Sequence, residues 1–224
     1  MPSWNMISLQ DPTSLPMMSL NSVHDLITQI MVMITIFIIY VIIYLLSNKL
    51  LNKSMMNNNI LELMWTIIPM IMLIGMATPS LKLLYLMEDS ETPYISVKTM
   101  GHQWYWSYEY SDFNKSFNSF MYYSDTNNFR SLDVDTRMIL PYNITSRIIC
   151  SSSDVIHSWT IPSMGLKTDA IPGRMNQLLI KPILMGMFFG QCSEICGMNH
   201  SFMPIVLEIS PSTEFIKWLK TIET

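Results

Sequence analysis

A twelve-residue segment near the C-terminus, residues 192–203, gathers the side chains best suited to hold a soft metal ion. It contains Cys192, Cys196, His200 and Met203, which supply two thiols, an imidazole and a thioether. Such ligands favour copper or zinc over hard cations, and a thioether is the usual weak axial ligand of electron-transfer copper. Two thiolates could bridge two copper ions, and each ion would then need one imidazole. The segment therefore predicts a two-copper site that takes its second histidine from elsewhere in the chain.

Three other histidines compete for that second position. His157 is the best candidate, because it lies in a strand-like run upstream of the segment. His102 is its rival, although it lies in an aromatic segment close to the membrane. His24 lies beside the first apolar run, and we do not expect it to reach the site. With Met203 axial on one copper ion, a backbone carbonyl between Cys192 and Cys196, such as that of Glu194, could be the weak ligand of the other.

Other roles for the same cysteines remain open at this point. A structural zinc site of two cysteines and two histidines has a similar local spacing. A redox disulfide between Cys192 and Cys196 would use the same thiols, but neither alternative explains Met203. Three cysteines argue against a complete disulfide framework. Cys150 lies in an apolar run, so we expect it to be a buried core residue.

Two long apolar runs predict a membrane anchor. Residues 26–46 carry no charge, and a second run spans residues 63–81, between Glu62 and Lys82. At about 1.5 Å of rise per residue, each run spans a hydrocarbon core of about 30 Å. Only 13% of the residues are charged, against about a quarter in soluble domains. We expect two transmembrane helices, at about 26–46 and 62–87, and a lipid bilayer as their environment.

The distribution of charge predicts the orientation of this anchor. Lys49 and Lys53 lie in the short connection between the runs, which has no acid, whereas the first 24 residues carry no lysine or arginine. The positive-inside rule then places the connection inside and both termini outside. The net charge of −4 argues against nucleic acid as a partner, because a basic patch is expected there.

The remainder of the chain predicts a β-rich outer domain. We expect residues 1–90 to form the N-terminal segment and hairpin, and residues 91–224 the outer domain. Short apolar or alternating runs separated by Pro, Gly, Ser and Asn favour a β-sandwich or barrel; they occur at residues 94–98, 132–138, 147–150, 155–161, 177–180, 187–189 and 202–209. A short helix ends the chain, with Ser210 as its expected cap and Pro211 at its first position.

Several motifs together resemble the mitochondrial cytochrome c oxidase subunit 2 family. They cover the copper loop, the aromatic segment and the second apolar run, at residues 65–69, 79–81, 101–110, 154–159, 169–174, 190–197 and 199–204. The resemblance implies a membrane-anchored α+β protein, with a two-helix hairpin and a cupredoxin-like β-barrel. It also implies a dinuclear copper A centre, whose ligands match His157, Cys192, Cys196, His200, Met203 and the carbonyl of Glu194.

The same resemblance implies further roles. The carboxylate of Glu194 would help to bind magnesium at the interface with subunit 1, and Asp169 matches a position near that interface. Trp104 matches the residue at which the electron arrives from cytochrome c, whereas we expect Tyr105, Tyr108 and Tyr110 to be packing residues. Glu62 matches a carboxylate at the mouth of a proton-uptake path.

Cytochrome c is a basic partner, so the resemblance implies an acidic docking surface. The matching positions are Glu109, Asp112, Asp135 and Asp154. The family commonly has acids just after the aromatic motif, whereas residues 114–118 here read Asn-Lys-Ser-Phe-Asn, and the loop over 113–128 looks shortened. We therefore predict a weaker electrostatic contribution to docking.

The implied activity is electron transfer from reduced cytochrome c to the haem and copper oxygen-reducing site of subunit 1, coupled to proton pumping. The implied location is the mitochondrial inner membrane, with both termini and the copper domain in the intermembrane space, among other oxidase subunits. A membrane-bound copper-delivery protein is the main alternative. A subunit of a quinol oxidase is another, although those relatives lack the copper ligands.

Overall fold

The computed structural model describes residues 5–52, 57–88, 92–123 and 129–222. The chain forms two compact units, one of residues 19–89 and one of residues 1–18 with 90–224. The boundary expected at residue 90 falls at 89–91, outside the described residues, as do Lys53 and residues 124–128 of the expected shortened loop.

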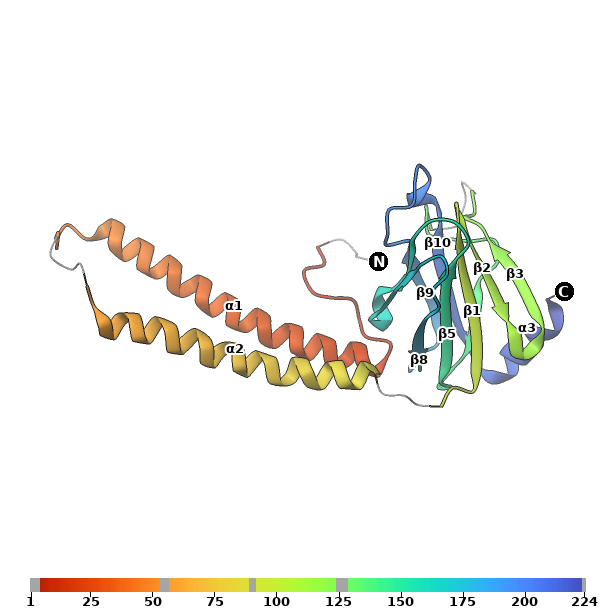
Figure 1. The fold of residues 1–224 in the computed structure, drawn as a ribbon, viewed down its shortest axis with the longest axis horizontal. Coiled ribbons are helices and arrows are strands. Elements are labelled where there is room, and N and C mark those ends of the chain that lie inside the picture. The colour runs from red at the N-terminus through yellow and green to blue at the C-terminus, as the bar shows by residue number, and fades with distance from the viewer. Residues whose placement is uncertain (1–4, 53–56, 89–91, 124–128, 223–224) are drawn as a thin grey trace. The chain divides into compact units, whose positions relative to one another are not determined.

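Two long antiparallel helices make up most of the first unit, α1 (Leu15–Ser47) and α2 (Asn59–Glu88) (Figure 1). Both are long and apolar enough to cross a membrane, and no residue of their most apolar windows is buried in the chain. An apolar helix that the protein itself leaves uncovered needs lipid or another membrane protein around it. The expected hairpin is therefore confirmed.

Polar side chains explain where the two helices begin. The Met17 amide donates to Oγ of Ser14 (3.2 Å), and the Leu61 amide donates to Oδ1 of Asn58 (3.2 Å). Such side chains satisfy amide groups that have no partner in the first turn of a helix. The Ser14 side chain lies well before the charge-free run. Helix α1 therefore begins at Leu15 and not near residue 26.

Strands and short helical turns make up the second unit. The strands are β1 (Ile95–His102), β2 (Tyr105–Tyr110), β3 (Lys115–Ser119), β4 (Met138–Pro141), β5 (Ser146–Ser152), β6 (His157–Ile161), β7 (Leu166–Ala170), β8 (Asn176–Ile180), β9 (Gly186–Gln191) and β10 (Pro204–Ser210). The part of the unit that the structure describes also contains the 3₁₀ turns Ser111–Phe113, Pro162–Met164 and His200–Phe202 and the helix α3 (Ser212–Thr221).

The described residues of this unit form three sheets, which make up the sandwich (Figure 1). The strand orders are β3-β2-β1-β5-β8, β4-β10-β9 and β6-β7. β1 pairs in parallel with β5, and β10 in parallel with β4, whereas the other pairs are antiparallel. The expected α+β class, with a β-sandwich and a final helix, is confirmed.

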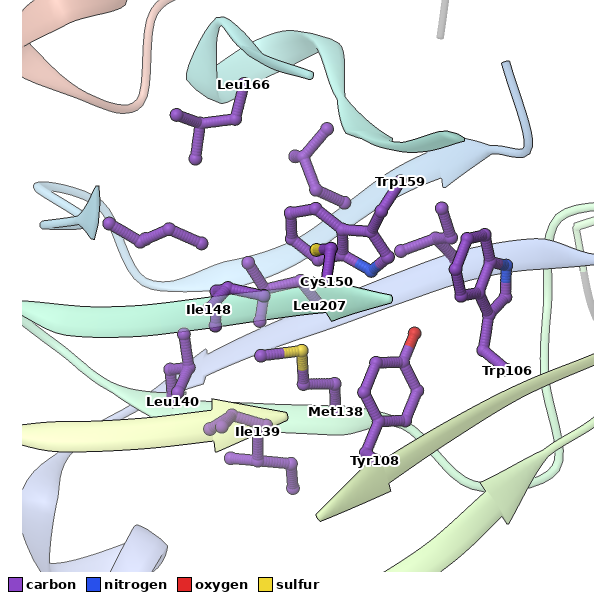
Figure 2. Packing of buried hydrophobic residues seen from close by; sticks show 14 of the residues in the cluster. Trp106, Tyr108, Met138, Ile139, Leu140, Ile148, Cys150, Trp159, Leu166 and Leu207 are labelled. Atoms are coloured by element: carbon purple, nitrogen blue, oxygen red, sulfur yellow. The ribbon is translucent and has the colours of Figure 1, made fainter. Parts of the chain in front are cut away.

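Aromatic and aliphatic side chains from all three sheets form one core. Figure 2 shows Trp106, Tyr108 and Trp159 directed into it, with Cys150 among the aliphatic residues. Cys150 is fully buried, as the sequence predicts, and burial raises the pKa of its thiol to about 12. Phe215 of α3 is also buried and belongs to this core.

Two local predictions are wrong. The run 132–138 is not a strand, because Asp133 and Asp135 accept hydrogen bonds from the amides of the residues that follow them, and such bonds compete with a strand ladder. Ser210 does not cap α3: it belongs to β10, its buried hydroxyl has no partner among the described residues, and Pro211 occupies the cap position.

Candidate metal centre

The loop between β9 and β10 brings the predicted ligands together. The two Sγ atoms of Cys192 and Cys196 lie 3.9 Å apart, and both thiols are free. A disulfide needs about 2.05 Å, so the structure does not contain the redox disulfide that the spacing left open. The two sulfurs and one ring nitrogen of His157 lie within 4.8 Å of one another, and all three residues are buried.

The remaining predicted donors surround these two sulfurs. Nδ1 of His157 lies 3.9 Å from Sγ of Cys192, and the carbonyl oxygen of Glu194 lies 3.3 Å from the same sulfur. Nδ1 of His200 and Sδ of Met203 each lie 3.5 Å from Sγ of Cys196. Each cysteine therefore has its own imidazole and its own weak donor.

Backbone contacts hold this loop against strand β6. The Ser193 amide donates to the Ser158 carbonyl at 3.1 Å. Where β9 crosses β6, a Cβ on Gly190 would overlap the Thr160 carbonyl oxygen. A larger residue at position 190 would push the two strands apart, so the sequence needs glycine there to bring the loop near His157.

His157 is held from several sides. Its ring lies against Gly101, where a Cβ would be 2.7 Å from Cδ2, and Trp106 meets it edge-on at 5.9 Å between ring centroids. Nε2 lies 2.9 Å from Oδ1 of Asp154. With Nε2 engaged, Nδ1 is the nitrogen left to face the sulfurs.

His102, the rival ligand, is engaged elsewhere. Its Nε2 lies 3.0 Å from the Ser107 hydroxyl and its Nδ1 lies 2.7 Å from the Ser153 hydroxyl. Its ring stacks on Tyr105, with centroids 4.5 Å apart. Both nitrogens therefore have partners, and burial lowers the pKa of this histidine.

The electrostatics of the site distinguish the two cysteines. Burial opposes the Cys192 thiolate, but hydrogen bonds with His157 and the nearby backbone outweigh it and lower the pKa of Cys192 to about 7. Burial and the neighbouring Cys192 thiolate raise the pKa of Cys196 to about 12. Burial also opposes the charged form of His157, yet the contacts with Cys192 and Asp154 raise its pKa. Without a cation between them, the two thiolates repel each other.

The donor set fits a pair of copper ions. Two thiolates could neutralise the charge of soft cations, and each ion could take one imidazole nitrogen. The thioether of Met203 lies at the site and is buried. A zinc site would leave this thioether without a role, since zinc binds cysteine, histidine and carboxylate.

Trp104 lies against the same loop. Its Nε1 donates to the Cys196 carbonyl at 3.3 Å, and the Gln103 side chain donates to the same carbonyl at 2.9 Å. A Cβ on Gly197 would lie 3.1 Å from the indole ring. As expected, Tyr108 and Tyr110 are buried in the core, whereas Tyr105 is only partly buried.

Each of the four expected docking acids has local hydrogen-bond partners. Glu109 accepts from Lys98 (2.8 Å), Asp112 from the Ser96 amide (2.8 Å), Asp135 from the Phe120 and Thr136 amides (2.8 and 2.6 Å), and Asp154 from the Gln103 and Val155 amides (2.7 and 2.6 Å). Burial tends to raise the pKa of Asp154, but its hydrogen bonds lower it overall. These acids therefore also stabilise the fold locally.

The other predicted residues lie away from the sulfurs. The Glu194 side chain is exposed, and Asp169 on β7 accepts a hydrogen bond from the Ser158 hydroxyl at 2.9 Å. Glu62 is exposed in the first turn of α2, in the other unit. Sequence reasoning missed Gly101 and the link between Asp154 and His157, although the three-residue separation of this acid and histidine was a usable signal.

The fold and the site define a membrane-anchored copper protein of the electron-transfer type. The family model described as cytochrome c oxidase subunit II, periplasmic domain, matches residues 95–210, and the one described as its transmembrane domain matches residues 2–83. The chain belongs to the cytochrome c oxidase subunit II family.

Relatives of this chain support that membership. Cytochrome c oxidase subunit 2 of Simulium vittatum is 50% identical over 223 residues, which cover 98% of this chain and 97% of the relative. The subunit of Aedes aegypti is 50% identical over 225 residues, which cover 99% of both chains. The crystal structure of the periplasmic domain of subunit II from Bradyrhizobium japonicum is 41% identical, with a TM-score of 0.56, and the match covers 59% of this chain and 95% of that one.

These matches extend over both the hairpin and the β domain, so the chain is a cytochrome oxidase subunit, and the family implies the copper A centre. The copper-delivery alternative is not favoured.

Proposed function

We propose that this chain accepts electrons from reduced cytochrome c and passes them to the oxygen-reducing site of subunit 1. The observation that carries the proposal is the convergence of four donors, from His157, Glu194, His200 and Met203, on the two free sulfurs of Cys192 and Cys196, which makes six donors in all. When bound, a copper pair held by these six residues would supply the one-electron chemistry, by accepting and then releasing a single electron.

The chain's own residues support this role by holding the donors still. Asp154 and Gly101 fix the His157 ring, and the Ser193 amide ties the loop to β6. Five of the six donors come from one short loop between two paired strands. A site that moves little when its charge changes has a low reorganisation cost, which favours fast electron transfer.

We assign Trp104 as the residue at which the electron from cytochrome c enters. The indole hydrogen bond to the Cys196 carbonyl provides a short link between a partly exposed ring and a ligand residue. Cytochrome c would dock over this ring. Lys98 pairs with Glu109, and residues 114–118 contain no acid, so we expect the electrostatic contribution to docking to be modest.

The partner that receives the electron is subunit 1. The exposed carboxylate of Glu194 is free of the sulfurs, because the proposed copper ligand is the carbonyl oxygen of this residue. We assign this carboxylate to a magnesium ion at the interface, and Asp169 to the neighbourhood of that interface. One residue would then connect two metals.

We place the chain in the mitochondrial inner membrane. Two of the relatives named above, 50% identical over nearly their whole length, are insect subunits, and the lysines of the connection between α1 and α2 favour the inner side for it. The β domain and both termini would then face the intermembrane space. Glu62 would lie at the inner end of α2, where we assign it to proton uptake.

Metal analysis and electron spin resonance on the copper-loaded full chain would test the central proposal. We expect two copper ions per chain and a spin signal shared by both nuclei. Cys196→Ser should abolish this signal, whereas Cys150→Ala removes a thiol from the core and should retain two copper ions. One copper ion per wild-type chain, or zinc alone, would contradict the proposal.

A further inference from the structure

Asp154 contacts both the proposed copper site and the turn that carries Trp104. Its Oδ1 lies 2.9 Å from Nε2 of His157, and its Oδ2 accepts a hydrogen bond from the Gln103 amide at 2.7 Å. The His157 side chain is fully buried, whereas the Asp154 side chain is 31% exposed. The carboxylate therefore lies between a buried ligand and the surface.

The carboxylate is itself held in one orientation. The Val155 amide donates to Oδ1 at 2.6 Å, and the Ser152 hydroxyl, which donates to the Val155 carbonyl, lies with its oxygen 3.2 Å from the same carboxylate oxygen. Ser152 in turn accepts from the Asp154 amide at 3.2 Å. An acid that serves only to attract a distant partner needs no such fixed geometry.

The turn beyond Gln103 lies directly on the copper loop. The side chains of Gln103 and Trp104 both donate to the Cys196 carbonyl, at 2.9 and 3.3 Å. Gly197 lies against the indole, with φ at +121°, so a side chain there would be strained as well as crowded. A shift of the Gln103 amide would move the ring away from the Cys196 carbonyl.

We propose that Asp154 is a positioning residue that orients two groups at once: the His157 imidazole, with Nδ1 toward the sulfurs, and the Gln103–Trp104 turn, against the copper loop. This inference rests on the function proposed above. A carboxylate can only accept a hydrogen bond from Nε2, so it selects the neutral tautomer whose Nδ1 lone pair is available to a metal. The same carboxylate sets the contact between the indole and Cys196.

A positioning role and a docking role predict different results. A docking acid acts through long-range charge, so its loss weakens the binding of cytochrome c in a salt-dependent way and leaves the copper spectrum unchanged. Loss of a positioning acid changes the spectrum and the rate at saturating cytochrome c. Such partners of metal ligands typically contribute about 10- to 100-fold in affinity or activity.

The test compares Asp154→Asn and Asp154→Ala with Asp112→Asn in the copper-loaded full chain. Asp112 is a matched control, because it is also an expected docking acid but accepts from the Ser96 amide, away from His157. We expect Asp154→Ala to alter the spin spectrum and to lower copper affinity or the saturating rate about 10-fold or more. Asp112→Asn should leave the spectrum unchanged. Wild-type spectra and saturating rates in both Asp154 variants would overturn the inference.

The metal-free full chain gives an independent readout. In alkaline buffer, nitrogen NMR should show His157 protonated at Nε2 in the wild type and a mixture of tautomers in the Asp154 variants. If Asp154→Ala does not fold, Asp154→Asn, which keeps the side-chain shape, decides the outcome. A wild-type chain without a two-copper signal would refute the proposed function. The nitrogen NMR shifts of the His157 imidazole would still decide the present inference. A tautomer mixture in the wild type, or no change in the variants, would overturn it.

Discussion

Replacing Gly101 with alanine should disturb the copper site without removing any ligand. A Cβ at this position would lie 2.7 Å from Cδ2 of the His157 ring, whereas ordinary contacts begin near 3.4 Å. The ring would have to move by about 0.7 Å, the difference between these distances. The backbone itself accepts alanine, because Gly101 is not among the glycines with positive φ.

The size of this movement sets the expected effect. Metal–ligand distances tolerate deviations of about 0.2 Å, so the displaced Nδ1 would no longer fit the same metal pair. Inserting a methyl group into a packed site also costs about 1–3 kcal/mol, and each kcal/mol lowers the unfolding midpoint by about 2–4 °C in a domain of this size.

The assay loads the full Gly101→Ala chain with copper and measures copper content, spin resonance and the thermal midpoint. Gly75→Ala is the matched control, since a Cβ at Gly75 meets nothing within 4 Å. We expect an altered spectrum and a lower midpoint in Gly101→Ala alone. Two copper ions, a wild-type spectrum and an unchanged midpoint would refute the steric reasoning.

Three further predictions concern reactivity, docking and the core. In the metal-free chain, alkylation of Cys192 should accelerate as the pH rises through about 7, because its thiolate forms there. Cys150, with a pKa of about 12, should stay unlabelled near pH 8 when the products are analysed by mass spectrometry. Equal labelling of both cysteines would contradict this. Turnover with cytochrome c should depend less steeply on ionic strength than in family members with acids after the aromatic motif, since residues 114–118 carry no acid and Glu109 is paired with Lys98; an equally steep salt dependence would count against it. Phe215→Ala should lower the free energy of unfolding of the β domain by about 3–5 kcal/mol, as measured by denaturant unfolding. Ile216→Ala, at a half-exposed position of the same helix, should lower it by much less. Similar losses in both variants would refute the burial argument.

The ligand loop was predictable because its chemistry is local. Cys192, Cys196, His200 and Met203 lie within twelve residues, so no long-range contact was needed to associate them. The choice between His157 and His102 depended on the fold. In β1, the Gly101 Cα faces the His157 ring, whereas the next residue, His102, bonds to two serine hydroxyls. Strand register decides such a choice, and the sequence does not state the register.

The errors in secondary structure have a common origin. Alternation of apolar and polar residues predicts a strand at 132–138, yet two aspartates there bond to the local backbone and turn the chain. The hydrophobic run at 26–46 marks the part of α1 suited to lipid, but the cap at Ser14 decides where the helix begins. In both cases a short polar side chain determined the backbone path, which a pattern of hydrophobicity does not register.

The connection between β9 and β10 also bears on the order of assembly. Its two ends are paired, since Gln191 lies opposite Pro204, and the hydrophobic core beneath it is closed by aromatic and aliphatic residues. A zinc finger needs its ion in order to fold, whereas this barrel has a core of its own. Copper can therefore bind as the last step of maturation, after the β domain has folded, and it can be removed without unfolding that domain.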